Sequence, residues 1–430
     1  MEDLRIAEYP GPLGVHDSAV IEKNVRETLL ERIVTALTRS DGGAGAGLAS
    51  GARDQRHIVF TGTQDEITRF FEAQEWSDGL PFVAPTVERI ERFLEYADRA
   101  AEEKIAVLPS ANLVATPWNV AANAVMAGCS PLHMPLLLAA VEALGDERMS
   151  LNNIGSSSGI IPYVLINGPI LKQLGIACGK QVVSRGPNPA IGRAVGLIVR
   201  NIAGFRPGTS YMGTFGYPLA FAFGESENES PWDPFHVEQG FDRHESTVTL
   251  GVTNNWGPAP APYESPDRPG AQVALEMLCR EITSKTRLFN FPARGPDAEH
   301  VMVTLLLSPP VAKSLANAGY SKQDVKCFIY ENAKMAIRDL EWVVKYTMTA
   351  RTTLRERVEA GVYPAEFLGA PDERVRIVSS PDILHVVVCG DPHRNRVMVF
   401  EGGHTRPTTK RVRLPENWPE LLSKAASWVS

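Results

Sequence analysis

Two neighbouring segments are so apolar that they restrict how this chain can fold. Residues 119–127 and 131–144 carry non-polar side chains on nearly every side of the helices that they predict, and only Gly128, Cys129 and Ser130 separate them. A helix that is hydrophobic all round is stable only when neighbouring elements cover every side of it. We therefore expect both segments to be internal helices of a large hydrophobic core.

Charge and hydropathy exclude two classes of partner. The longest apolar run, residues 134–144, is much shorter than the roughly 20 residues of a membrane-spanning helix. The formal net charge is -7, and no long run of Lys and Arg offers a surface for nucleic acid. The N-terminus lacks the basic and apolar regions of a secretory signal. Five scattered cysteines without a C-x-x-C pair indicate free thiols. We expect a cytoplasmic protein that binds neither nucleic acid nor membrane.

The order of predicted helices and strands indicates a mixed α/β fold in three parts. Residues 1–56 hold an amphipathic helix, near residues 22–38, and a flexible Gly/Ala-rich linker. Residues 57–295 form a mixed α+β main domain, and residues 296–430 form a smaller Rossmann-like α/β unit. The predicted strands are residues 160–166, 219–223, 248–252, 300–307 and 383–388.

The break between the two apolar helices is the first candidate site. Gly128 can end one helix in the left-handed conformation, and Ser130 can cap the next. Cys129 then lies just outside a helix N-terminus, where the helix dipole lowers the pKa of a thiol. We expect Cys129 to act as a nucleophile, His133 as its base or orienting group, and Asn123 as a substrate ligand. The alternative is a small buried cysteine that fills space between two helices.

An acidic segment that follows the predicted strand at 219–223 is the second candidate. Ligands of α/β folds collect beyond the carboxyl ends of strands. In an extended chain, Glu225, Glu227 and Glu229 would project from one side. Crowded carboxylates raise one another's pKa and suit acid–base catalysis. We expect Glu227 and Glu229 to transfer protons, and the alternative is a solvated acidic loop.

The same segment allows a metal-dependent reading. Glu227, Glu229, His236 and His244 offer carboxylate and imidazole ligands for a divalent metal ion, although no established metal-binding spacing is present. This reading predicts a metal-dependent lyase or hydrolase.

The third candidate is an anion site at residues 185–193. Asn188 precedes a predicted helix, and Arg185 and Arg193 flank it. A helix N-terminus with nearby arginines can hold a carboxylate or a phosphate, so we expect Asn188 and Arg193 to bind an anionic group of the substrate. The pattern is neither a Walker A loop nor a dinucleotide fingerprint. The alternative is a structural helix whose arginines form other pairs.

Two loops at strand ends complete the candidates. Ser157 lies in a Ser-rich loop before the strand at 160–166 and can offer a hydroxyl group to a ligand. Cys389 ends the strand at 383–388 and can offer a second thiol. A tight turn accounts for either loop as well.

Several short motifs point to one family. They are Asp78-Gly79-Leu80-Pro81, Pro85-Thr86, residues 123–131, Asn167-Gly168-Pro169, residues 188–194, Glu227-Asn228-Glu229, residues 231–234 and Ser380-Pro381-Asp382-Ile383. Together they resemble the long bacterial proteins associated with the UGSC family of (seleno)proteins, and the resemblance covers most of residues 76–400. In that family a small unit with a redox-like UGSC motif is fused to the long protein or encoded beside it.

The resemblance implies thiol- or selenol-linked chemistry on a small molecule and adds Asn167 to the expected substrate ligands. The chain has no UGSC segment, so a redox partner would be a separate small protein, and Cys389-Gly390 stands where the family more often has Gly-Gly. The leading prediction is an enzyme that acts on a small anionic molecule through Cys129, with acid–base help from carboxylates. A non-catalytic subunit that binds a small redox protein is a further alternative, and self-association into a homo-oligomer is compatible with the size of the chain.

Overall fold

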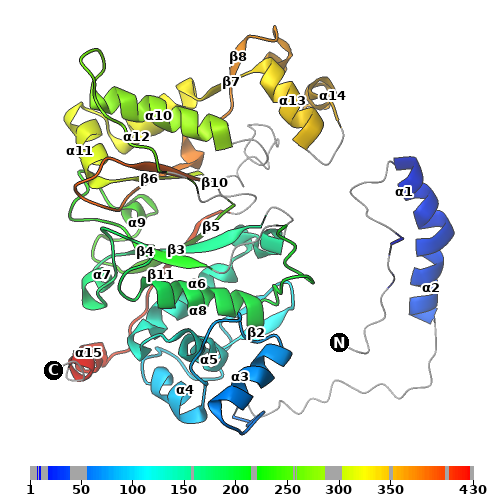
Figure 1. The fold of residues 1–430 in the computed structure, drawn as a ribbon, viewed down its shortest axis with the longest axis vertical. Coiled ribbons are helices and arrows are strands. Elements are labelled where there is room, and N and C mark those ends of the chain that lie inside the picture. Colours follow the sequence, from blue (N-terminus) through cyan, green and yellow to red (C-terminus); the bar gives the residue numbers. More distant parts are fainter. Residues whose placement is uncertain are drawn as a thin grey trace.

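Two sheets lie face to face between two layers of helices in the computed structural model (Figure 1). The structure describes residues 7, 9–10, 18–38, 56–155, 159–214, 220–254, 257, 259–285, 303–347, 352–401 and 406–426. The predicted fold class, mixed α/β, is confirmed.

The described helices and strands have these bounds. The helices are α1 Ser18–Asn24, α2 Leu30–Thr38, α3 Gln64–Ala73, α4 Val87–Leu94, α5 Pro117–Ala127, α6 Met134–Leu144, α7 Ile170–Gln173, α8 Asn188–Asn201, α9 Phe235–Glu238, α10 Gly270–Lys285, α11 Pro309–Asn317, α12 Lys322–Asn332, α13 Ile337–Thr347, α14 Leu354–Glu359 and α15 Trp418–Ala426. The strands are β1 Ala106–Leu108, β2 Leu113–Ala115, β3 Ile161–Asn167, β4 Phe221–Gly224, β5 Thr247–Thr253, β6 Val303–Leu307, β7 Lys334–Ala336, β8 Arg374–Arg376, β9 Leu384–Val388, β10 Val397–Glu401 and β11 Thr408–Arg411.

The first sheet has the strand order β11-β5-β3-β4, in which β3 and β4 run parallel. Along β3, Val164 and Ile166 belong to the core beneath α5, α6 and α8, whereas Tyr163 and Leu165 pack between the two sheets. Successive side chains of a strand point to opposite faces, so a strand covered on both faces is apolar throughout. This burial explains why the sequence around residues 160–166 shows a continuous apolar run.

The second sheet has the order β10-β6-β9 and combines a parallel pair with an antiparallel pair. Its outer face packs against α10, α11 and α12, and its inner face lies against the first sheet. The hydroxyl groups of Tyr163 and Thr304 lie 2.8 Å apart across the two sheets. A Rossmann-like unit has helices on both faces of its sheet, whereas here the first sheet takes the place of one helical layer.

Packing divides the chain differently from the expected boundary between residues 295 and 296. Helix α10 precedes that boundary, but its buried residues, among them Leu275 and Leu278, belong to the second core. The C-terminal segment returns to the first core, where β11 pairs with β5 and Trp418 and Leu421 are buried. Each core therefore combines segments that lie far apart in the sequence.

Local capping confirms the expected break between the two apolar helices. Gly128 ends α5 in the left-handed conformation with φ of 78°, a conformation that favours glycine. The hydroxyl group of Ser130 accepts a hydrogen bond from the Leu132 amide, and residues 131–133 form a single 3-10 turn before α6. Both helices are buried in the first core, as their composition predicts.

The N-terminal helix runs through α1, a π-helical turn and α2, and α2 contains no buried residue. The expected linker near residues 40–47 lies outside the described residues. Within the described ranges, no helix is both long enough and apolar enough to cross a bilayer.

Candidate functional site

The carboxyl ends of strands from both sheets meet at one pocket. Asn167 ends β3 and Glu225 follows β4, while Cys389 follows β9. The amide of Ser226 donates a hydrogen bond of 2.7 Å to the carbonyl of Val388, which joins the two sheets at this end. The pocket has a volume of about 710 Å³ and is lined by residues 168, 169, 171–173, 176, 178, 179, 225–229, 243, 390 and 392. We call it the carboxylate pocket.

One amide group bridges two carboxylates at this pocket. Nδ2 of Asn167 donates hydrogen bonds to Oε2 of Glu225, at 2.6 Å, and to Oε1 of Glu227, at 2.9 Å. The backbone amide of Gly168 donates a second bond to Glu227, at 2.7 Å, and that of Phe235 donates one to Glu225, at 2.8 Å. These four bonds hold both carboxylates in fixed orientations, as acid–base chemistry requires.

The two carboxylates differ in their exposure. The side chain of Glu225 is completely buried, and that of Glu227 is 18% exposed and lines the pocket. Burial raises the pKa of Glu225, and the ammonium group of Lys322, 3.9 Å from Oε1, opposes this rise. A sealed carboxyl group beside a reachable one resembles the paired carboxyl groups with which many enzymes separate proton donor from acceptor.

Several buried polar atoms around this pair have no hydrogen-bond partner among the described residues. They are Oδ1 of Asn167, Oε1 of Glu225 and both ring nitrogens of His236. His236 is fully buried, and its Nδ1 lies 3.7 Å from Oε1 of Glu227. Buried polar atoms in folded proteins nearly always have a partner, so unpaired ones indicate a place that a ligand or water completes.

Two glycines allow this arrangement. Gly168 has φ of +88°, and a Cβ atom there would collide with the backbone of Glu245. A residue with a side chain is therefore excluded at the position whose amide binds Glu227. At Gly224 a Cβ atom would lie 2.6 Å from Sγ of Cys178, so the glycine lets this thiol pack against β4 in the pocket wall.

Lys322, the first residue of α12, connects the second core to the pocket. Its side chain is 8% exposed. Nζ donates a hydrogen bond of 2.7 Å to the carbonyl of Asp233 and forms an ion pair with Glu238. The same Nζ lies 3.9 Å from Oε1 of Glu225. Lys322 is not among the site residues expected from the sequence. A positive charge in the first turn of a helix is unfavourable, because it opposes the helix dipole. This unfavourable position of Lys322 was the sequence feature that could have indicated an acidic partner elsewhere in the fold.

The acidic segment is folded into turns, so the expectation of an extended chain is wrong. The amide of Glu227 donates to the carbonyl of Glu225, and the amide of Ser230 to that of Ser226, both at 3.0 Å. Consequently Glu229 points to the rim, where it is half-exposed and pairs with Lys313. The structure brings Asn167 and Glu227 together, and the second carboxylate at the centre is Glu225 where the sequence analysis expected Glu229.

The residues of the metal-dependent reading are not assembled. In the described part of the chain, no group of three or more His, Cys, Asp and Glu side chains is arranged to hold a metal ion. Glu229 pairs with Lys313, and His244 is exposed. Of the four expected ligands, Glu227 and His236 alone approach each other.

Cys129 is half-buried against the first core, His133 is buried, and neither lines the carboxylate pocket. Sγ of Cys129 donates to the Ala190 carbonyl at 3.3 Å, and burial raises the pKa of this thiol. Nδ1 of His133 accepts a hydrogen bond from the Ser130 amide, and burial lowers its pKa to about 4. The expectation that the helix N-terminus lowers the pKa of Cys129 is wrong, because desolvation of the sulfur outweighs the dipole.

Arg193 is used inside the protein. It forms a two-pronged pair with Asp78, with both N–O distances 2.9 Å, and donates to the carbonyl of Pro81 at 2.8 Å. The arginine therefore ties α8 to the Asp78-Gly79-Leu80-Pro81 segment, and its guanidinium group is occupied. Ser157, another expected ligand, lies outside the described residues.

The two remaining expected ligands are also engaged in the core. Asn188 is fully buried, where it donates to the carbonyls of Ala177 and Val182 and accepts from the Ala177 amide. Asn123 donates to the carbonyl of Asn119 and accepts from Asn201. Asn188 fastens the preceding loop to α8, which is its structural alternative, and Asn123 ties α5 to the end of α8.

Thiol labelling tests the burial of Cys129. We expect iodoacetamide at neutral pH to modify the exposed Cys327 at least about tenfold faster than Cys129, because reaction requires an accessible thiolate. Mass spectrometry of peptides from a time course measures both rates in the same sample. Equal rates would show that Cys129 is open and ionised.

Two buried histidines predict a stability that depends on pH. Burial lowers the pKa of His133 to about 4 and, together with Lys326 and Lys322, that of His385 to about 3, from the ordinary 6.5. Between pH 6.5 and 4 the unfolded chain binds more protons than the folded one, so the free energy of unfolding should fall as the pH falls, by up to about 1.4 kcal/mol per histidine for each pH unit. Urea unfolding at several pH values measures this slope, which His133→Asn should make shallower. An unchanged slope in this variant contradicts the prediction for His133.

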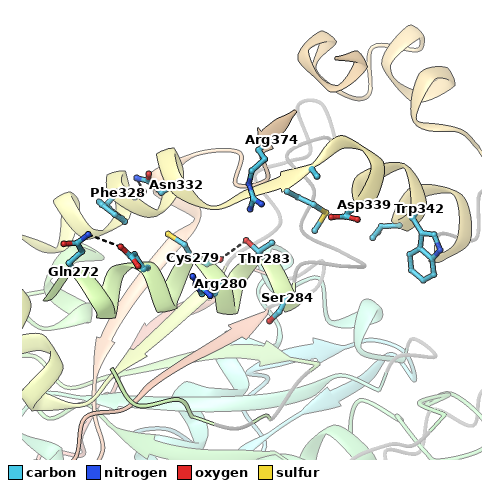
Figure 2. Close-up of a pocket in the computed structure, with 14 residues that line it drawn as sticks. Gln272, Cys279, Arg280, Thr283, Ser284, Phe328, Asn332, Asp339, Trp342 and Arg374 are labelled. Carbon is cyan, nitrogen blue, oxygen red and sulfur yellow. Dashed lines mark hydrogen bonds between the residues drawn. The ribbon is translucent and has the colours of Figure 1, made fainter. Parts of the chain in front are cut away.

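A larger groove of about 870 Å³ lies outside the second core (Figure 2). One face of α10 lines it, and the exposed Trp342 on α13 lies at its far end. Its side chains bond along α10: Gln272 donates to Glu276 at 3.0 Å, and Thr283 to the Cys279 carbonyl at 2.8 Å. None of the unpaired buried atoms found in the described residues belongs to its lining. We therefore place the candidate site at the carboxylate pocket.

No family model matches the chain, and neither a curated protein nor a solved structure is similar to it. The resemblance to the proteins associated with the UGSC family stays a prediction from the motifs.

Proposed function

We propose that this protein is an enzyme that transfers a proton to or from a small polar molecule bound in the carboxylate pocket. One observation carries the proposal: Asn167 holds a sealed carboxyl group, Glu225, beside a reachable one, Glu227. Buried polar networks are costly unless they are fully satisfied. A network with several unpaired atoms at the edge of a pocket is therefore better explained by ligand binding than by stability.

In this proposal Glu227 exchanges the proton with the substrate. Asn167 and the Gly168 amide both bond to Oε1, which fixes the plane of the carboxylate relative to the pocket. Asn167 and Glu225 are positioning residues, because both side chains are completely buried and Asn167 bonds to both carboxylates. General acid–base catalysis by one positioned side chain contributes about 10²–10⁴ in rate.

The proposal replaces Cys129 as the reactive group. Cys178 also lines the pocket, but burial and the charges of Glu227 and Glu225 raise its pKa to about 12. A neutral thiol in this position can donate a hydrogen bond to a ligand, whereas thiolate chemistry is disfavoured. A cytoplasmic location is part of the proposal, and the five free cysteines support it.

The test is consumption of a metabolite. Purified protein is incubated with a bacterial small-molecule extract, and mass spectrometry compares wild type, Glu227→Gln and Glu72→Gln. Glu72 is an exposed carboxylate on α3 and provides a matched control. We expect at least one compound to be consumed by wild type and by Glu72→Gln but not by Glu227→Gln. Equal consumption by all three proteins, or by none, would overturn the proposal.

A further inference from the structure

We infer that the ligand of the carboxylate pocket is a small zwitterion, whose primary or secondary ammonium group binds at Glu227 and whose carboxylate binds at the Lys172 side of the rim. This inference rests on the proposed function for its choice of pocket. It differs from the small anionic substrate expected from the sequence, because Arg193 and Asn188, the residues that carried that expectation, are engaged elsewhere.

Among the described residues, carboxylate oxygens dominate the inner end of the pocket, and the thiol of Cys178 in its wall is a weak donor. Glu227 and Glu225 contribute carboxylate oxygens, and the sole donor group of Asn167 already bonds to both of them. Oδ1 of Asn167 is a further acceptor without a hydrogen-bond partner in the described part of the chain, whereas Oε1 of Glu225 faces Nζ of Lys322 at 3.9 Å. A group with several N–H donors complements such a surface, and an anion would be repelled by it.

Within the described ranges, the carboxylate of Glu227 also has no fixed counter-ion at hydrogen-bond distance. Lys322 lies beside Glu225, on the buried side of the pair. The nearest described group to Glu227 that can carry a positive charge is His236, whose Nδ1 is 3.7 Å away. An ammonium group would provide both the missing charge and the missing donors, and hydrogen bonds between charged groups are the stronger kind.

One side of the rim carries a positive charge, in contrast to the acidic inner end of the pocket. Lys172 lies on α7, is exposed, lines the pocket, and has no ion-pair partner among the described residues. The other charged rim residues are already paired, Glu229 with Lys313 and Arg243 with Asp233. Lys172 is therefore the rim group that remains available for a carboxylate of the ligand.

Binding of matched small molecules tests the inference. The zwitterionic probes are alanine, β-alanine and 4-aminobutanoate. Each of three analogues lacks one feature: butylamine lacks the carboxylate, butanoate lacks the ammonium group, and 4-(trimethylammonio)butanoate has a cationic nitrogen without N–H donors. Isothermal titration with wild type should show that at least one zwitterion binds about tenfold or more tightly than all three analogues. Glu227→Gln and Lys172→Met should each weaken that binding about tenfold, and Lys104→Met, an exposed lysine remote from the pocket, should not.

Three results would overturn the inference. They are an analogue that binds as tightly as the best zwitterion, unchanged binding in Glu227→Gln or Lys172→Met, and no binding of any zwitterion at about 10 mM. The outcome is separable from that of the metabolite experiment. Glu227-dependent binding of a zwitterion without consumption of any compound refutes the proposed enzyme and leaves the inference standing. Glu227-dependent consumption of a compound that is not a zwitterion, without binding of any zwitterion, supports the proposed enzyme and refutes the inference.

Discussion

Replacement of Glu227 by Gln should lower kcat for the substrate found in the metabolite experiment by about 10²–10⁴ while leaving the fold intact. Gln has the same shape, and its amide oxygen can still accept the bonds from Asn167 and Gly168. It cannot take up a proton at neutral pH. The loss should therefore appear in kcat, and circular dichroism and the midpoint of urea unfolding should stay near the wild-type values.

A partial variant sharpens this test. Asn167→Asp replaces the bridging amide by a third carboxylate, which should weaken activity because it repels Glu225 and Glu227. Its activity should recover in part below neutral pH, where the cluster takes up a proton, whereas Glu227→Gln should stay inactive at every pH. A Glu227→Gln protein with kcat within about threefold of wild type would refute the catalytic role of Glu227.

Replacement of Lys322 by Met should destabilise the folded protein by about 3–5 kcal/mol, the usual cost of removing one partner from a buried ion pair. Lys322 is 8% exposed, and Glu225, which it faces, is completely buried. Met fills a similar volume, so the loss is that of the charge and of the bonds to Asp233 and Glu238. Urea unfolding measures the change.

Three comparisons identify the cause of that destabilisation. Lys313→Met removes an exposed lysine paired with an exposed Glu229, so it should cost no more than about 1 kcal/mol. The double variant Lys322→Met with Glu225→Gln should recover part of the loss. Without Lys322 the pKa of Glu225 should rise further, so the folded state binds more protons than the unfolded chain above the ordinary pKa of a glutamate. Lys322→Met should therefore be less destabilised at pH 5 than at pH 8, and equal destabilisation would contradict this account.

Sequence patterns predicted the features that depend on neighbouring residues. The caps at Gly128 and Ser130, the burial of α5 and α6, and the strands β3 and β5 all follow from backbone preferences and hydrophobic periodicity over about ten residues. The strand-end rule also pointed to the segment that lines the carboxylate pocket, since Glu227 lies just beyond β4. Asn167 came from the resemblance, and the structure places it against Glu227.

The same local reasoning failed for Cys129 and Arg193. The pKa of a thiol depends on how far its sulfur is desolvated, and an arginine is available only if no distant carboxylate holds it. Asp78 lies 115 positions before Arg193, and Ala190 lies 61 positions after Cys129. No local sequence pattern around either residue reaches partners that are so far away along the chain.

By itself the sequence determined five of the described strands, the two helices that are apolar all round, and that an acidic segment follows a buried strand. Tertiary structure alone decided that Glu225 is sealed, that Asn167 bridges it to Glu227, and that Lys322 reaches the pair from the second core. The physical reason is that chain propensity and hydrophobic burial act between near neighbours, whereas the protonation and reach of a side chain depend on every charge and every layer packed around it.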